Sequence, residues 1–404
     1  MKKLLIIALA ATTLFAACSK DGGGGNPALP EGTHSLTVKA SVPGMGESRA
    51  DTGTAVGKTP AIDAMTLVFV KDGIVDKLHT ATVATITTTG ETVSGISTGT
   101  VSNSIYVFGG NTDVPVNPAV AALVPATSTE AQVKAILYDM ANQATGEDAT
   151  KVSTRGYSTY TVVSGGTAAA NLEVVPAVSR IEIKTVEAKT TPTDPADQVQ
   201  SFDLEGIYIN NTFKKIGADY TVYPTAAGDI VNYDSENVIW ASGYDARYHD
   251  AFTTNTGAAT YSAADFWSYY TAPAQQQSGA SYVGTKIPEG GVAVQYLAVP
   301  HIVCKLNNVM VGASAPGTLQ ANPNTAGQWK GTNTLFVRVT KYKTTGGVDI
   351  NYFEPGKVYQ IEKISFDATN LHSNPVPKPE DKHNVIATVV VKNWEGVVTD
   401  PVLD

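Results

Sequence analysis

The chain has few cysteines. Only two of its 404 residues are cysteines, Cys18 and Cys304, and the first lies in a targeting segment. The mature chain therefore has no disulfide framework, and its stability must come from packed apolar surface. Charged residues make up only 16%, and the net charge of −9 argues against a nucleic-acid partner.

Catalytic and metal-binding signatures are also missing. The sequence has no phosphate-binding loop ending in Lys-Ser or Lys-Thr, no His-Glu-x-x-His and no Cys-x-x-Cys, and its six histidines are scattered. We therefore predict no enzyme activity, no cofactor and no metal site. Cys304 lies in an apolar strand context, 301–306, which predicts an inert core thiol.

The first residues have the pattern of an export signal. Lys2 and Lys3 precede an apolar run, 4–17, that is too short to span a bilayer, and Cys18 follows directly. We interpret 1–17 as a lipoprotein signal peptide, with acylation of Cys18 and a glycine-rich tether at 22–25. The alternative is an ordinary secretory signal in which the cysteine is incidental. No later run is long and apolar enough for a transmembrane helix, so the rest of the chain is expected outside the cytoplasm.

Short strands separated by turn residues dominate the remaining sequence. Residues 34–42 alternate between apolar and polar side chains, which predicts a half-buried strand. We predict further strands at 64–70, 81–88, 104–108, 159–163, 172–175, 180–186, 202–210, 220–223, 238–240, 292–299, 335–342, 358–366 and 384–394. One helix is predicted in 128–140, because Val133, Ile136 and Met140 recur at helical spacing behind a Ser-Thr-Glu start.

Strands at this spacing favour β-sandwiches. The polar segment 189–199, with Pro192 and Pro195, is the candidate boundary between two domains. The Tyr-rich interval 233–282 has no clean period and is predicted to form long loops with short elements. Its aromatic residues between Tyr244 and Tyr282 are interpreted either as internal packing or as a sugar-stacking or partner-binding surface.

Two strands at opposite ends of the chain, and one arginine, are the most informative features. The first strand is followed by a Gly-rich polar loop, 43–53, in which Arg49 is the single basic residue and a protease target. In the last strand, one face carries Val385, Ala387, Val389 and Val391, and the other carries Ile386, Val390 and Trp394. A strand that is apolar on both faces is expected to be covered on both.

Taken in order, these features resemble the fimbrillins, the subunits of type V pili. The resemblance rests on the signal ending at Cys18, the first strand with Glu47-Ser48-Arg49-Ala50 behind it, the segment Ala177-Val178-Ser179-Arg180-Ile181-Glu182-Ile183 and the terminal Val-Val-Val-Lys-Asn-Trp, and it spans essentially the whole chain. It implies a lipidated precursor at the outer membrane and cleavage by an arginine-specific protease between Arg49 and Ala50. The first strand, with Leu36, Val38, Ala40 and Val42, then leaves, and the C-terminal strand of another subunit, with Val385, Ala387, Val389, Val391 and Trp394, replaces it.

The resulting expectation is a mostly β chain with two tandem Ig-like or transthyretin-like β-sandwich domains, the first with a short helix, and a C-terminal donor strand. The expected segments are the signal 1–17, a lipidated propeptide 18–49, an N-terminal domain 50–190, a C-terminal domain 191–383 and the donor segment 384–404. Such a head-to-tail contact does not close, so it builds a filament, the surface fimbrium, that supports adhesion. The alternative from another class is a surface lipoprotein that binds glycan.

Overall fold

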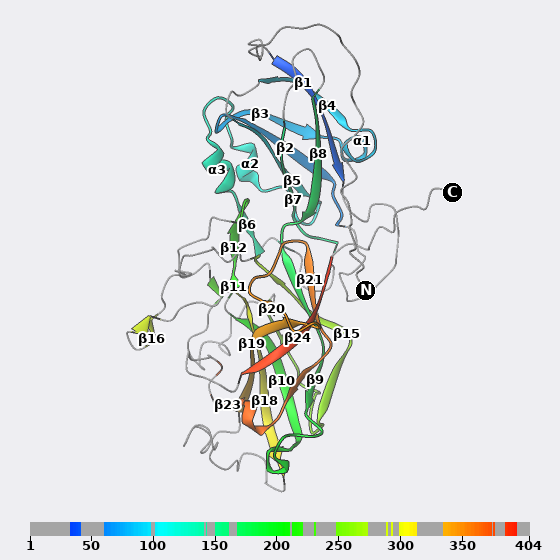
Figure 1. The fold of residues 1–404 in the computed structure, drawn as a ribbon, viewed down its shortest axis with the longest axis vertical. Helices are drawn as coiled ribbons and strands as arrows, with labels where there is room; N and C mark the ends of the chain where they lie inside the picture. The colour runs from blue at the N-terminus through cyan, green and yellow to red at the C-terminus, as the bar shows by residue number, and fades with distance from the viewer. Residues whose placement is uncertain are drawn as a thin grey trace, which may run out of the picture.

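We describe the protein from a computed structural model. The structure describes residues 33–41, 60–97, 102–140, 143, 150–160, 168–210, 212–220, 230–231, 248–273, 288–289, 292–293, 299–312, 334–373, 375 and 384–393. These residues form two bodies of β structure that follow one another along the long axis of the molecule, the first near the top of Figure 1 and the second below it.

The first body is a seven-stranded sheet in the order β3-β2-β5-β7-β8-β1-β4. The neighbours β2, β3, β5, β7 and β8 are antiparallel, whereas β1 is parallel to β8 and antiparallel to β4. The two ends of the order, β3 and β4, come close together. The strands are β1 (Thr33–Ser41), β2 (Ala64–Lys71), β3 (Ile74–Ala81), β4 (Glu91–Ser97), β5 (Asn103–Gly110), β7 (Thr154–Thr159) and β8 (Ala168–Pro176).

The second body is an eleven-stranded sheet whose main path is β14-β10-β18-β19-β24-β21-β9-β15. Strands β20 and β23 pair with β19, and β22 pairs with β9. Its members are β9 (Ser179–Ala188), β10 (Val199–Asn210), β14 (His249–Ala251), β15 (Thr260–Thr271), β18 (His301–Val311), β19 (Thr334–Thr344), β20 (Asp349–Ile350), β21 (Lys357–Ile361), β22 (Ile364–Phe366), β23 (Leu371–His372) and β24 (Val385–Asn393).

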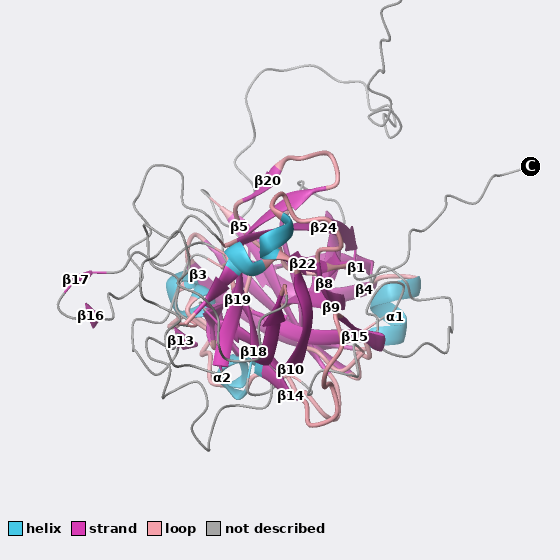
Figure 2. Cartoon of the chain, turned by 90° about the horizontal axis from the view of Figure 1, so that it is seen from below, coloured by secondary structure: helices cyan, strands magenta, loops and turns pink. Residues whose placement is uncertain are grey.

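Three short strand pairs and a few helical turns complete the described chain. The pair of β6 (Leu137–Asp139) with β12 (Lys215–Gly217) joins the two bodies; the others are β11 (Thr212–Phe213) with β13 (Ile230–Val231) and β16 (Pro288–Glu289) with β17 (Val292–Ala293). The helices are α1 (Val83–Thr88), α2 (Pro118–Ala121) and α3 (Glu130–Lys134), with 3-10 turns η2 (Pro195–Asp197) and η5 (Ala368–Asn370). Viewed along the long axis, α1 and α2 lie at the edge of the strands (Figure 2). Within the described residues, no helix has the length and apolar character needed to cross a membrane.

Two separate clusters of buried side chains hold the fold. The larger one runs from the outer face of the first sheet, beneath α2, α3 and β6, into the interior of the second body. The smaller one fills the inner face of the first sheet and contains Leu36, Val38 and Ala40 of β1. Because apolar burial is the main favourable term in folding, the first strand stabilises one cluster and leaves the other untouched.

The predicted mostly β architecture with two sandwich-like bodies is confirmed. The strands predicted at 64–70, 104–108, 180–186, 202–210 and 335–342 all lie within observed strands. The change of sheet falls between β8 and β9, so the strand at 179–188 belongs to the second sheet although it precedes the predicted boundary at 190–191.

The helix predicted in 128–140 is much shorter than expected. It begins as predicted, with Thr129 and Gln132 forming a reciprocal cap, but it ends at Lys134. Leu137–Asp139 then forms β6 and pairs with Lys215–Gly217, and the Lys134 carbonyl accepts a hydrogen bond from Ala218 N at 3.0 Å. Partners almost 80 positions away therefore decide the backbone of this segment.

The strand predicted at 81–88 is wrong, since Val83–Thr88 forms α1. The run is rich in β-branched residues, which favour strands, but Ile86 is fully buried in the smaller cluster with Val83 against it. Tertiary packing therefore overrides local preference. The expected long loops at 233–282 are also wrong in part, because Thr260–Thr271 is a twelve-residue strand.

Candidate functional site

The first strand occupies a slot between two neighbours. Leu36 through Ser41 pair in parallel with Ala168 through Glu173 of β8, and Thr33 through Val38 pair antiparallel with β4. The three apolar side chains, Leu36, Val38 and Ala40, have no exposed surface. Three of the four residues predicted as the displaced strand therefore lie together in one core, and Val42 lies outside the described residues.

The opposite face of β1 is polar, as the alternation predicted. Ser35 Oγ donates to Ser94 Oγ at 3.1 Å, Thr37 and Thr92 hydroxyls lie 3.1 Å apart, and Lys39 is exposed. These bonds are near solvent and contribute little net stability. The strand is held mainly by its two backbone ladders and its apolar face.

The backbone between the end of α1 and the start of β4 lies close to β1. Gly90 has φ +85°, and a Cβ atom there would lie 3.0 Å from Thr37 Cγ2 and 3.3 Å from the Val38 carbonyl oxygen. Its N–H caps α1 by donating to Thr85 O at 3.0 Å. Glycine at this position lets the helix end and the strand begin directly against the backbone of β1.

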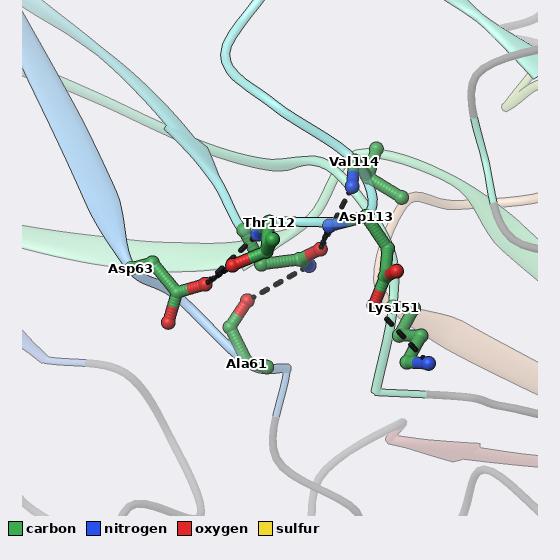
Figure 3. A network of polar contacts seen from close by, with 7 residues as sticks. Ala61, Asp63, Thr112, Asp113, Val114 and Lys151 are labelled. Atoms are coloured by element: carbon green, nitrogen blue, oxygen red, sulfur yellow. Dashed lines mark hydrogen bonds and ion pairs between the residues drawn. The ribbon is translucent and has the colours of Figure 1, made fainter.

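Residues just before β2 are hydrogen-bonded to the turn that follows β5, and Figure 3 shows this polar network. Asn111 Nδ2 donates to the Ala61 carbonyl at 3.0 Å, while its Oδ1 accepts from the backbone of Asp113 and Val114. Both the N–H and the hydroxyl of Thr112 donate to Asp63 Oδ2 at 2.8 Å. Ala61 and Asp63 are thus tied to the turn after β5, independently of β1.

The C-terminal strand lies inside its own domain. Residues 385–389 of β24 pair in parallel with β19, and residues 390–393 pair antiparallel with β21, so β24 passes from one neighbour to the other along its length. Val385, Ala387 and Val389 are buried in the larger cluster. The expectation that both faces are covered is wrong, because Ile386 is 52% exposed.

Val391, on the other face, is also less covered than expected, since it is 39% exposed. The ladder with β19 ends at Val389, so Val391 lies where the strand has moved to β21 and beyond the three buried positions. The remaining predicted site residues, Cys18, Arg49, Ala50 and Trp394, lie outside the described residues. Sequence reasoning missed β4, the antiparallel partner of β1, because a bulge at Gly95 interrupts its alternation.

Most aromatic side chains of the interval 244–282 that the structure describes pack internally. Tyr248, Tyr261, Tyr269 and Tyr270 are buried, and Tyr261 makes an edge-on contact with Phe202 at 5.1 Å. Phe252 and Trp267, with ring centroids 5.3 Å apart, are only partly buried. Internal packing therefore accounts for most of this group.

Burial in the core favours the neutral forms of Cys304 and His301. Burial raises the pKa of the Cys304 thiol to about 12, which agrees with the predicted inert thiol. Burial, and after it the charge of Arg338, lowers the pKa of His301 to about 3. Among the described residues, no group of three or more His, Cys, Asp or Glu side chains is arranged to hold a metal ion.

Solved structures resemble this arrangement over nearly the whole chain. A candidate cell adhesion protein from Parabacteroides distasonis ATCC 8503 matches with a TM-score of 0.50 and 13% identity, covering 91% of this chain and 98% of that one. The chain shares its fold. A candidate cell adhesion protein from Bacteroides eggerthii DSM 20697 (TM-score 0.47, 14% identity, 92% and 100% covered) and a fimbrilin from Porphyromonas gingivalis W83 (0.47, 17%, 90% and 98%) are also similar.

A fimbrilin, the kind of protein that the sequence resembles, is among these neighbours. At such identities the likeness concerns the fold alone. No protein-family model matches the chain, and no curated protein matches it either.

Proposed function

We propose that the protein is a structural subunit of a type V pilus and assembles by strand exchange. A protease cuts between Arg49 and Ala50, β1 leaves the first sheet, and the C-terminal strand of another subunit fills the slot. The observation that carries the proposal is the position of β1, whose apolar side chains Leu36, Val38 and Ala40 are fully buried in a cluster separate from the main core.

The slot has the properties that strand addition needs. Loss of β1 would leave unpaired backbone edges on β4 and β8 and empty the pockets of Leu36, Val38 and Ala40. Exposed edges and apolar pockets both favour an incoming strand with alternating apolar side chains. Val385, Ala387 and Val389 of β24 supply such an alternation.

The way β24 is held favours its proposed role as donor. Each half of the strand has one ladder, the first half with β19 and the second with β21. Release therefore breaks one row of backbone bonds along the strand, and Ile386, which is half-exposed, adds less to its retention than a buried side chain would. The regained pairing in the slot of the next subunit would offset this loss.

The same proposal includes the predicted route to the cell surface. Residues 1–17 would direct export, lipid on Cys18 would hold the precursor at the outer membrane, and the mature chain would enter a surface fimbrium that supports adhesion. Identical or related subunits are the partners, together with an arginine-specific protease. Replacement of Cys18 by Ala is expected to abolish palmitate labelling and mislocalise the precursor.

The test uses purified chain from residue 18 onward, before and after limited digestion with trypsin, followed by denaturing gels and negative-stain microscopy. A cut after Arg49 followed by filaments is the expected result. The variant Arg49→Ala should stay uncut there and monomeric, while Lys39→Ala, an exposed position within β1, should behave like the parent chain. A cut chain that stays monomeric at all concentrations would instead favour the glycan-binding lipoprotein.

A further inference from the structure

The two ends of the first sheet meet along a row of side-chain contacts rather than a backbone ladder. β3 is one end of the strand order and β4 is the other. Asp76, Lys77 and His79 of β3 reach across to β4, and Glu91 of β4 reaches back toward β3. We call these four residues the β3–β4 seam.

Two contacts of the seam join a side chain of β3 to the backbone of β4, and the others join Glu91 to His79 and to the residue that follows β3. Asp76 Oδ2 accepts a hydrogen bond from Ser97 N at 2.8 Å, and Lys77 Nζ donates to the Ser94 carbonyl. The Glu91 carboxylate lies 2.5 Å from His79 Nε2 and accepts from Thr82 N at 2.7 Å. Side chains of His79 and Glu91 are only 27% and 16% exposed, so their interaction is less screened than a surface pair.

A β-bulge in β4 positions the backbone carbonyl that Lys77 contacts. Gly95 has φ +74° and lies in the bulge where the ladder with β1 skips from Val93 to Ile96. The bulge keeps both Val93 and Ile96 in the core and leaves the Ser94 carbonyl beside Lys77. A side chain added at Gly95 would be strained and would lie 3.4 Å from Lys77 Nζ.

Departure of β1 would remove both the backbone partner and the apolar neighbours of β4, so the seam would then be important for holding β4. In the described part of the chain, β1 is the strand that forms a ladder with β4. Once β1 leaves, Val93 and Ile96 also lose Leu36 and Val38 as neighbours in the smaller cluster. The seam contacts involve no atom of β1, so the loss of β1 removes no partner from any of them.

We propose that the β3–β4 seam holds β4 in place after β1 has left, so that the incoming strand meets a slot with both edges already built. This inference rests on the proposed strand exchange and adds four positioning residues to it: Asp76, Lys77, His79 and Glu91. If β4 is already ordered, binding of the incoming strand does not carry the conformational-entropy cost of ordering it. Without the seam, β4 would have to be ordered in the same step as strand uptake.

The test measures the position of β4 directly. Spin labels are placed on Thr80→Cys in β3 and Thr92→Cys in β4, both exposed positions, in the chain from residue 18 onward with Cys18→Ser. The slot is emptied in two independent ways: by trypsin cleavage followed by removal of the N-terminal peptide, or by Leu36→Asp with Val38→Asp, which no longer suit an apolar slot. Label distances are compared with those of the intact chain.

The seam is removed by Asp76→Ala with Glu91→Ala. The matched control, Asp113→Ala with Asp349→Ala, removes two exposed carboxylates with the same change in charge. With an empty slot, the parent and the control should keep the narrow distance distribution, and the seam variant should broaden. Uptake of a synthetic peptide of residues 384–404 should be about tenfold slower in the seam variant, the effect of a few lost hydrogen bonds.

Equal label distances in parent and seam variant with an empty slot would overturn the inference. A narrow distribution in the parent without any peptide uptake or filaments would leave the seam intact and refute strand exchange. A first strand that neither treatment dislodges would overturn both, because a slot that never empties needs no preformed edge.

Discussion

Residues of the same strand differ in how deeply they are buried, and therefore in how much they stabilise the fold. Leu36 is fully buried in the smaller cluster, whereas Lys39, three positions later in the same strand, is exposed. His301 is buried in the second body, with a neutral ring favoured by burial and by Arg338. The consequences of substitution can therefore be predicted separately for each body.

Leu36→Ala should destabilise the first body by about 2–5 kcal/mol, because it removes a fully buried side chain and leaves a cavity. Urea unfolding monitored by circular dichroism measures this loss. Lys39→Ala is the matched control and should stay within about 0.5 kcal/mol of the parent. Equal stability of the two variants would contradict the observed burial of β1.

The His301 ring should make the second body sensitive to mild acid. Its folded pKa of about 3 lies below the unfolded value of about 6.5, so the unfolded chain binds the proton first as the pH falls. Stability is therefore complete above pH 6.5 and declines from there toward pH 3. Between pH 7 and pH 5 this group alone costs about 2 kcal/mol.

Unfolding of the parent and of His301→Gln at both pH values measures this effect. The glutamine variant lacks the titrating ring, so its loss of stability over this interval should be smaller by about 2 kcal/mol. An identical pH dependence in the two proteins would mean that the ring is protonated in the folded state or is not buried there.

At the level of elements, the two terminal strands occupy different kinds of position. β1 pairs with a neighbour on each side over Leu36 to Val38, while β24 changes neighbour after Val389. The seam joins β4, a neighbour of β1, to β3, and the network around Asn111 ties the chain before β2 to the turn after β5, both without using any atom of β1. In the proposed exchange, these contacts would keep their partners when β1 leaves.

A covalent lock on β24 should block assembly. Lys357 and Asn393 are opposite each other in the β21–β24 ladder, and directly opposed antiparallel positions suit a disulfide. Lys357→Cys with Asn393→Cys should therefore form a bridge that abolishes filaments after cleavage at Arg49, and reductant should restore them. Electron microscopy with and without reductant measures this.

The matched control is Thr66→Cys with Thr80→Cys, which joins β2 to β3, two strands that stay paired during the proposed exchange. This bridge should leave filament growth unchanged. Filaments of normal length from the locked β24 variant under oxidising conditions would show that the donor lies elsewhere in the chain.

For the molecule as a whole, the division of the core into two clusters sets how it responds to loss of β1. The larger cluster spans both bodies, and Tyr220 contributes to the junction through its hydroxyl, which donates to the Ala177 carbonyl at 3.2 Å, and its ring, 4.4 Å from the Arg155 guanidinium carbon. The smaller cluster is confined to the first body. Removal of β1 should thus weaken the smaller cluster directly and leave the contacts of the larger cluster in place.

Alkylation of Cys304 reports on the second body, because the thiol is fully buried and burial raises its pKa to about 12. The urea midpoint for Cys304 alkylation by iodoacetamide should be the same before and after removal of the N-terminal peptide. The midpoint for the first body, followed through a labelled Thr80→Cys, should fall. A parallel fall of both midpoints would mean that the two clusters unfold as one unit.

The sequence by itself determined the features that depend on local pattern: the alternating face of β1, the cap of α3 at Thr129, the buried thiol of Cys304 and the mostly β character of the chain. Only the tertiary structure decided which strands are neighbours. It turned 83–88 into a helix, ended α3 at Lys134, ordered β15 and brought β3 against β4. Local periodicity reports which side of a segment is apolar, but pairing and burial depend on residues distant in the chain, and their energy exceeds that of local preference.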